Sequence, residues 1–132
     1  MIVVDASVVA VALADDGDDG DSARARLRHE RLAAPELIDL EVGSVLRRQL
    51  ANGAIDERRA RLALDDLTDL PIRRAPHLPL LTRCWELRDN LTFYDAAYVA
   101  LAEHLGSTLL TGDARLSNAA GPRCVVELLV PE

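Results

Sequence analysis

The stretch Leu91–Leu116, which reads LTFYDAAYVALAEHLGSTLLTGDARL, constrains the fold more than any other part of the chain. Thr92 and Asp95 have the spacing of a capping box, so we expect a helix to begin here. An alanine-rich segment follows, and Gly106 is placed to end the helix as a C-cap. Ser107–Thr111 is short and mostly apolar, which is typical of a buried strand. The stretch therefore predicts a helix followed directly by a strand, the repeating unit of an α/β protein.

The rest of the chain continues this alternation. We expect further strands at Met1–Val4, Leu32–Ala34, Ile72–Ala75 and Cys124–Val130. We expect further helices over Val8–Leu13, from Asp21 or Ser22 through Arg31, from Pro35 to Asn52-Gly53, from Asp56 to Leu70, over Leu78–Arg88, and as a short turn at Asp113–Ala119. The two long helices in the middle should form a protruding αα-hairpin, and the glycines of Asp15–Gly20 predict a loop. The pattern predicts a single α/β domain, residues 1–132, with a parallel sheet covered by helices on both faces.

The composition limits the classes of function. Of the 132 residues, 49% are hydrophobic and 28% are charged, which fits a globular domain. All 15 basic residues are arginine, so lysine-based mechanisms are excluded, and the net charge of −7 disfavours a general nucleic-acid binder. Cys84 and Cys124 are too isolated for a zinc site or a disulfide framework, so we expect a cytoplasmic protein. No signal peptide or membrane span is expected.

Two carboxylates follow strands that we expect to be buried. Asp5 ends the first strand, and Asp113 follows the strand Ser107–Thr111. Ligands of open parallel sheets bind beyond the carboxyl ends of the strands, so both are candidates for one site. An aspartate after a strand is also a common turn former or cap, and this alternative stays open for each.

Glu41 and Asp95 lie on helices. The neighbours of Glu41 on its helix face include Ile38 and Val45, where a carboxylate is costly unless it is paired or bound to a cation. The alternative is a glutamate at the helix edge that reaches water. Asp95 can act as the capping partner of Thr92 and still leave its outer oxygen free.

The four carboxylates together suggest a metal site. Two carboxylates ~4 Å apart repel each other by about 4 kcal/mol at an effective dielectric constant near 20. A pocket that holds four of them needs raised pKa values or a divalent cation. Oxygen ligands without His or Cys favour Mg²⁺ or Mn²⁺. The chemistry that fits is hydrolysis of a phosphodiester by metal-activated water.

Four segments in order resemble one family. They are IVVDASV at the start, Glu41 in the long helix, YDAAYVALAEHLG around Asp95, and TLLTGDARL around Asp113. Their order and spacing are similar to those of PIN-domain ribonucleases, specifically the VapC-type toxins of prokaryotic toxin–antitoxin pairs. The matching segments extend from Ile2 to Leu116.

The resemblance implies a five-stranded parallel sheet and an Mg²⁺- or Mn²⁺-dependent ribonuclease, the toxin of a type II toxin–antitoxin system. It implies that the catalytic residues are Asp5, Glu41, Asp95 and Asp113, that the metal ligands among them are Asp5, Asp95 and Asp113, and that Ser7 and Thr111 support the site with their hydroxyls. It further implies an RNA substrate, a homodimer, and a cognate VapB-type antitoxin whose C-terminal segment wraps the toxin and blocks the site.

Other polar and aromatic residues have two interpretations each. Arg115 is a candidate phosphate contact or a surface salt bridge, and Asn118 falls where the family often has a polar residue near the metal. The cluster Arg47, Arg48, Arg58, Arg59 and Arg61 could meet RNA or antitoxin, or could be a solvated face. We expect Phe93, Tyr94, Tyr98 and Trp85 to pack in the core, although the first three could stack bases. We expect His29, His77 and His104 to be surface or cap residues.

Three other classes of protein share some of these features. A receiver-type signalling domain needs a lysine that this chain lacks. A haloacid-dehalogenase-like phosphatase expects a second aspartate two residues after the first, where this chain has Ser7. A catalytically silent PIN domain that acts only as a binding partner remains an alternative, as does the phosphatase.

Overall fold

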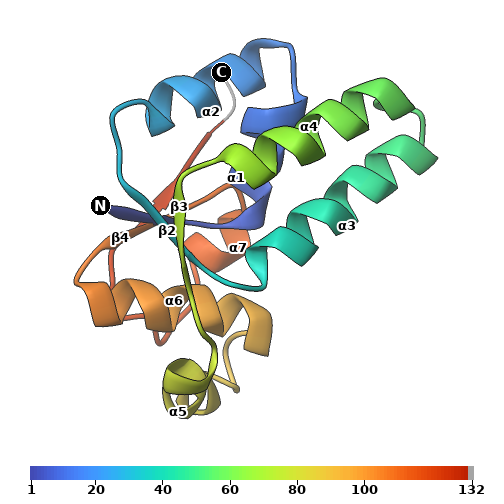
Figure 1. Cartoon of the computed structure of the whole chain (residues 1–132). Helices are drawn as coiled ribbons and strands as arrows, with labels where there is room; N and C mark the ends of the chain where they lie inside the picture. Colours follow the sequence, from blue (N-terminus) through green and yellow to red (C-terminus); the bar gives the residue numbers. More distant parts are fainter. Residues whose placement is uncertain (131–132) are drawn as a thin grey trace.

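A computed structural model describes residues 1–130 of the chain (Figure 1). The strands are β1 (Ile2–Val4), β2 (Leu32–Pro35), β3 (Ile72–Ala75), β4 (Thr108–Thr111) and β5 (Val126–Leu128). The helices are α1 (Ala6–Ala14), α2 (Asp18–Leu27), α3 (Ile38–Ala51), α4 (Glu57–Asp69), α5 (Leu81–Glu86), α6 (Phe93–Leu105) and α7 (Ala114–Ser117), with a 3-10 turn η1 (Leu78–Leu80) before α5. Strands and helices alternate along the chain, so the predicted α/β class is confirmed.

The five strands form one parallel sheet in the order β3-β2-β1-β4-β5. The central strand β1 pairs with β2 on one side and with β4 on the other. The chain therefore leaves β1 in one direction and later returns to its other edge, which makes the gap between β1 and β4 a topological switch point. The five-stranded parallel sheet that the resemblance implies is confirmed.

Helices cover both faces of the sheet (Figure 1). On one face α6 packs against β1, β2 and β4, with α5 beyond it, and on the other α1 packs against α2. The helices α3 and α4 form the predicted hairpin, which leans on α1 and extends away from the sheet. Within residues 1–130, no helix combines the length and the apolar character that a membrane span needs.

Several boundaries differ from the prediction. The helix α2 begins at Asp18, inside the acidic run that we expected to be a loop, because Asp18, Asp19 and Asp21 lie in its first turn, where the helix dipole favours acids. Gly20 is needed there, since a Cβ would lie 1.8 Å from the carbonyl oxygen of Asp15. Pro35 ends β2 and does not open α3.

The core is built from aliphatic side chains, as the low aromatic content of 3% requires. In the described part of the chain, Tyr98 is the only aromatic side chain in this core. The only buried polar or charged side chains there are Asp5, which is 8% exposed, and Thr111, which is fully buried. Because burial of polar groups is costly without partners, these two residues mark a specialised place in the core.

Candidate active site

Asp5 occupies the junction between β1 and α1. Its backbone is extended, and its side chain accepts a hydrogen bond from the N–H of Val8 at 3.2 Å, so Asp5 is the N-cap of α1. The Ser7 hydroxyl donates to Asp5 Oδ1 at 2.5 Å, and the Thr111 hydroxyl donates to Asp5 Oδ2. The carboxylate is therefore fixed by three donors from two neighbouring segments.

The sheet register brings β4 to Asp5. Val4 of β1 pairs with Leu110 of β4. The residues that follow them, Asp5 and Thr111, therefore lie side by side. The loop after β4 is held to the same group, because Gly112 N donates to Ser7 Oγ at 3.0 Å. A Cβ at Gly112 would lie 3.1 Å from Ser7 Oγ, so the loop approaches the serine closely.

Asp113 lies at the outer side of this loop. Its backbone N–H donates to Thr111 Oγ1 at 3.0 Å, and its side chain caps α7 by accepting from the N–H of Arg115 at 2.9 Å. The Arg115 guanidinium also approaches Asp113 Oδ2 at 3.2 Å. Hydrogen bonds from Arg115 lower the pKa of Asp113 below its ordinary value. Asp113 is thus linked to Asp5 through Thr111 but is paired with an arginine.

Asp95 lies in the first turn of α6. Its backbone N–H donates to Thr92 Oγ1 at 3.1 Å, so the predicted N-cap is confirmed, as is the C-cap at Gly106, which has φ 61°. Burial raises the pKa of Asp95, and the charge of Asp113 raises it further. A hydrogen bond with Thr92 opposes this shift.

Glu41 reaches the same region from α3. The Tyr98 hydroxyl donates to Glu41 Oε1 at 2.7 Å, which joins α3 to α6. Burial raises the pKa of Glu41, and the charges of Asp95 and Asp5 raise it further, against the hydrogen bond from Tyr98. Burial also raises the pKa of Asp5, with a smaller contribution from the charge of Asp95. The charge of Asp95 therefore disfavours the ionised forms of both Asp5 and Glu41, and the charge of Asp5 also disfavours that of Glu41.

The carboxylates do not form a finished metal cage. Within residues 1–130, no group of three or more His, Cys, Asp or Glu side chains lies close enough to hold a metal ion as it stands. The donor chemistry nonetheless fits a hard divalent cation, since all the ligands offered are carboxylate and hydroxyl oxygens. Mg²⁺ is usually held by one or two carboxylates and keeps several waters, so a complete protein cage is not needed.

The carboxylates Asp5, Glu41, Asp95 and Asp113 are called the acid pocket below. The remaining predicted residues lie around it or away from it. The Arg115 side chain is 93% exposed, and the salt-bridge interpretation describes its contact with Asp113. Asn118 caps the end of α7, and its amide donates to the carbonyl of Ala114 at 2.9 Å. Arg59 bonds Asp16 and the carbonyl of Leu13. The other members of the hairpin cluster, Arg47, Arg48, Arg58 and Arg61, are exposed.

The predicted core position is right for Tyr98 and wrong for the other aromatic residues. Trp85 is 60% exposed, Phe93 42% and Tyr94 67%. The first turn of α6 is exposed at Phe93 and Tyr94, whereas Ala96–Ala102 in the later turns are buried. His77 is half-buried, and its ring accepts a hydrogen bond from the N–H of Leu37 at 2.9 Å, so it caps the start of α3.

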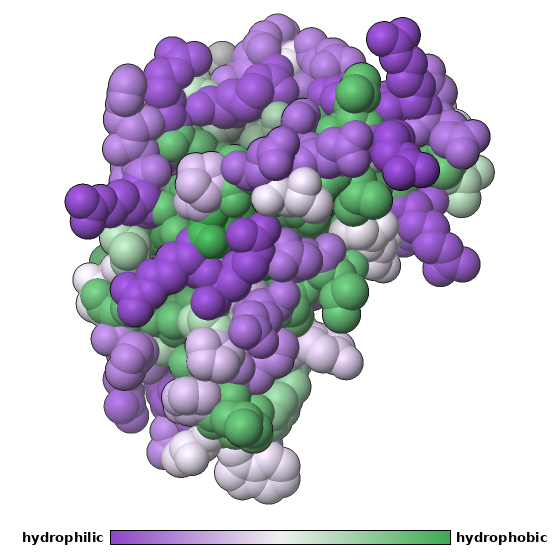
Figure 2. Space-filling view, viewed as in Figure 1, coloured by the Kyte–Doolittle hydropathy of each residue, from purple (hydrophilic) through white to green (hydrophobic). Residues whose placement is uncertain are grey.

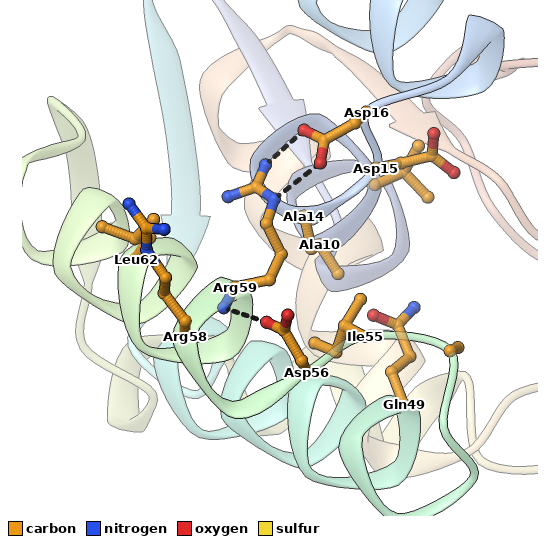
Figure 3. A pocket seen from close by; sticks show the side chains of 12 residues that line it. Ala10, Ala14, Asp15, Asp16, Gln49, Ile55, Asp56, Arg58, Arg59 and Leu62 are labelled. Carbon is orange, nitrogen blue, oxygen red and sulfur yellow. Dashed lines mark hydrogen bonds and ion pairs between the residues drawn. The ribbon is translucent and has the colours of Figure 1, made fainter.

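A prominent hollow of the surface lies elsewhere. It measures about 610 Å³ and lies between the C-terminal end of α1 and the α3–α4 hairpin (Figure 3). Arg59 crosses it toward Asp16, and Gln49 Oε1 is buried there with no hydrogen-bond partner among residues 1–130. The carboxylates of the acid pocket come from the opposite end of α1 and from the start of α3, so this hollow is a separate feature.

Comparisons of the sequence with known proteins identify its family. The profile of the PIN domain matches residues 2–122. The chain is 48% identical over 128 residues to Ribonuclease VapC1 of Mycobacterium tuberculosis, and the aligned region covers 96% of both proteins. It is 42% identical over 129 residues to VapC ribonuclease Mb0985 of Mycobacterium bovis, which covers 98% of both.

Two solved structures share the fold. Mycobacterium tuberculosis VapC20, described as a Sarcin-Ricin loop cleaving toxin, matches with a TM-score of 0.72 and 18% identity over 100% of both chains. PAE2754 from Pyrobaculum aerophilum matches with a TM-score of 0.69 and 27% identity, over 95% of this chain and 81% of that one. The chain therefore belongs to the PIN-domain family and, within it, to the VapC group.

Proposed function

We propose that this protein is the toxin of a type II toxin–antitoxin system and cleaves RNA in the cytoplasm with Mg²⁺ or Mn²⁺ as cofactor. The observation that carries the proposal is the group of three carboxylates Asp5, Glu41 and Asp95. Burial raises the pKa of each of them, and the charge of at least one neighbouring carboxylate raises it further. Perturbed carboxylates gathered at a topological switch point are typical of functional sites. The relatives named ribonuclease supply the reaction class.

The residues of the pocket have separate roles in this proposal. Asp5, Asp95 and Asp113 would hold the cation, which would stabilise the charge that develops on the phosphodiester. The hydroxyls of Ser7 and Thr111 keep the Asp5 carboxylate in one orientation. Glu41, with its raised pKa, is suited to accept the proton of the attacking water.

The substrate contacts are proposed at the rim. Arg115 is exposed and close to Asp113, where it can reach an RNA phosphate. Asn118 follows one turn later and is exposed, although its amide is engaged with the backbone of α7. The net charge of −7 agrees with an RNA affinity that depends on the cation and a few arginines.

Two protein partners belong to the proposal. The VapC relatives support a cognate VapB-type antitoxin that covers the pocket. A homodimer is supported by exposed apolar side chains, since Leu78 is 79% exposed, Leu40 81% and Trp85 60%. Figure 2 shows apolar side chains gathered over α5, at the lower end of the molecule.

The experiment that tests the activity uses purified protein on a panel of RNAs, including a sarcin–ricin loop oligonucleotide. We expect cleavage with Mg²⁺ or Mn²⁺ that EDTA abolishes. Asp5→Asn and Asp113→Asn should each lose at least about 100-fold in rate, because even outer partners of metal sites typically contribute 10–100-fold. The control is Asp65→Asn, which removes an exposed acid on α4.

Equal cleavage by wild type and both pocket variants would contradict the proposal. A protein that cleaves none of the RNAs but still binds an antitoxin would instead be the catalytically silent PIN domain. The lack of a finished three-ligand cage in residues 1–130 is the observation that keeps this second candidate in view.

A further inference from the structure

The two tyrosines of the chain lie on one helix in opposite environments. Both belong to α6, with Tyr94 in the first turn and Tyr98 in the second. Tyr94 is 67% exposed, whereas Tyr98 is 2% exposed and is the aromatic side chain of the core. A tyrosine buried this deeply needs a partner for its hydroxyl. Its partner is Glu41 Oε1, at 2.7 Å.

We infer that Tyr98 is a positioning residue of the acid pocket, and that its buried hydroxyl holds the carboxylate of Glu41 on α3 in place beside Asp95 on α6. The inference deepens the proposed function and rests on it. Tyr98 and Asp95 are three positions apart, so they lie on the same face of α6. One helix thus supplies both a carboxylate of the pocket and the anchor for a second carboxylate from another helix.

The placement of Glu41 explains why an anchor is needed. Glu41 is half-buried, and it is repelled by the charges of Asp5 and Asp95. Its side chain has several rotatable bonds, so without a hydrogen bond it can turn toward water along the surface of α3. Tyr98 is rigid because it is packed into the core, and a rigid donor limits that movement. Partners of this kind typically contribute 10–100-fold to a site.

The hydrogen bond also connects two helices that are far apart in the sequence. The helices α3 and α6 come from different parts of the chain, and Tyr98 and Glu41 are 57 positions apart. The hydrogen bond thereby connects α3 with α6 beside the carboxylates of the site. Tyr98 is only 2% exposed and its hydroxyl is bonded to Glu41, so its effect on the reaction must pass through Glu41.

The test compares Tyr98→Phe with Tyr94→Phe. Each variant keeps the aromatic ring and removes one hydroxyl, so the exposed Tyr94 is a matched control for the buried Tyr98. We expect Tyr98→Phe to lower kcat for RNA cleavage by about 10-fold with KM little changed, and Tyr94→Phe to match wild type. A Tyr98→Phe variant with wild-type kcat would overturn the positioning role.

A second measurement is independent of activity. In urea unfolding, Tyr98→Phe should lower the midpoint by about 0.5 M or more in wild type, because it leaves a half-buried carboxylate without its donor. In a Glu41→Ala background, the same substitution should change the midpoint much less. Equal shifts in both backgrounds would show that the hydroxyl does not hold Glu41 and would refute the inference.

The two measurements separate the inference from the proposed function. If wild type cleaves no RNA, the ribonuclease proposal fails, and the unfolding cycle alone decides whether Tyr98 holds Glu41. If wild type is active and the cycle shows no coupling, the ribonuclease proposal stands and the role of Tyr98 is rejected.

Discussion

Asp95 and Glu103 lie on the same helix, α6, about two turns apart, and their surroundings are opposite. Burial raises the pKa of Asp95, and the nearby charge of Asp113 adds to this effect. Burial acts on Glu103 in the same direction, but bonds from the Arg83 guanidinium at 2.7 and 3.1 Å and from the N–H of Arg123 at 2.7 Å outweigh it, so its pKa is lowered.

The contrast separates carboxylates whose charge stabilises the fold from carboxylates whose charge destabilises it. Glu103 forms an ion pair with Arg83, and Glu127 forms one with Arg26. Asp5 and Glu41 receive only hydroxyl and backbone donors, although the chain has 15 arginines to offer. No arginine thus neutralises the charge of these two carboxylates within residues 1–130, which agrees with the proposed cation.

The largest expected effect on stability is at Glu103. Arg83→Met should lower the free energy of unfolding by about 2–4 kcal/mol, because it leaves a carboxylate that is 15% exposed without its cation. Urea or thermal unfolding measures this loss. The control, Arg123→Met, keeps the backbone N–H that bonds Glu103 and should change stability much less. Similar losses in both variants would show that the guanidinium of Arg83 is not what stabilises Glu103.

A smaller effect of opposite sign is expected in the acid pocket. Glu41→Gln keeps an oxygen that accepts from Tyr98 but removes the charge that Asp5 and Asp95 repel. The free energy of unfolding at pH 7 should therefore rise by up to about 1 kcal/mol, reduced by solvent screening. Ribonuclease activity should fall at the same time. A variant that is both less stable and less active would contradict the idea that this carboxylate strains the fold.

The smallest expected effect is the pH dependence of these two contributions. The pKa of Glu103 is lowered, so its contribution to stability is present above its ordinary value of 4.5 and is lost as the pH falls below it. The pKa of Glu41 is raised above 4.5, so its destabilising effect is present near neutral pH and is relieved as the pH falls toward 4.5.

Unfolding of wild type, Glu41→Gln and Glu103→Gln between pH 7 and pH 3 tests this difference. The gap between wild type and Glu41→Gln should narrow from neutral pH downward, and the gap between wild type and Glu103→Gln should narrow only below about pH 4.5. If both stability differences from wild type changed over the same pH range, the distinction between the surroundings of Glu41 and those of Glu103 would be wrong.

Much of the fold was predictable from the sequence because its signals are local. Thr92 and Gly106 mark the ends of α6, and Asp56 marks the start of α4. The positions of Asp5 and Asp113 after strands predicted that both lie at the same edge of the sheet. These signals depend on backbone chemistry within a few residues.

The contacts of the site were less predictable because they depend on which faces meet. The sequence predicts that Tyr98 lies in the core, but its hydrogen bond to Glu41 depends on where α3 lies relative to α6, which no local signal gives. Trp85 was assigned to the core on residue type alone, and residue type does not say which side of a short helix is covered. The acidic run into which α2 extends was harder to predict, because its glycines favour a loop, whereas the close approach of Gly20 to the backbone of Asp15 accommodates a helix.

The bond between Thr111 and Asp5 joins positions that are 106 residues apart in the sequence. A ribosome must therefore synthesise almost the entire polypeptide, and β4 must leave the exit tunnel, before the first carboxylate can meet its partner. A nascent chain that stalls earlier carries Asp5, Glu41 and Asp95 but cannot assemble the pocket. Under the proposed function, ribonuclease activity therefore requires translation to pass β4.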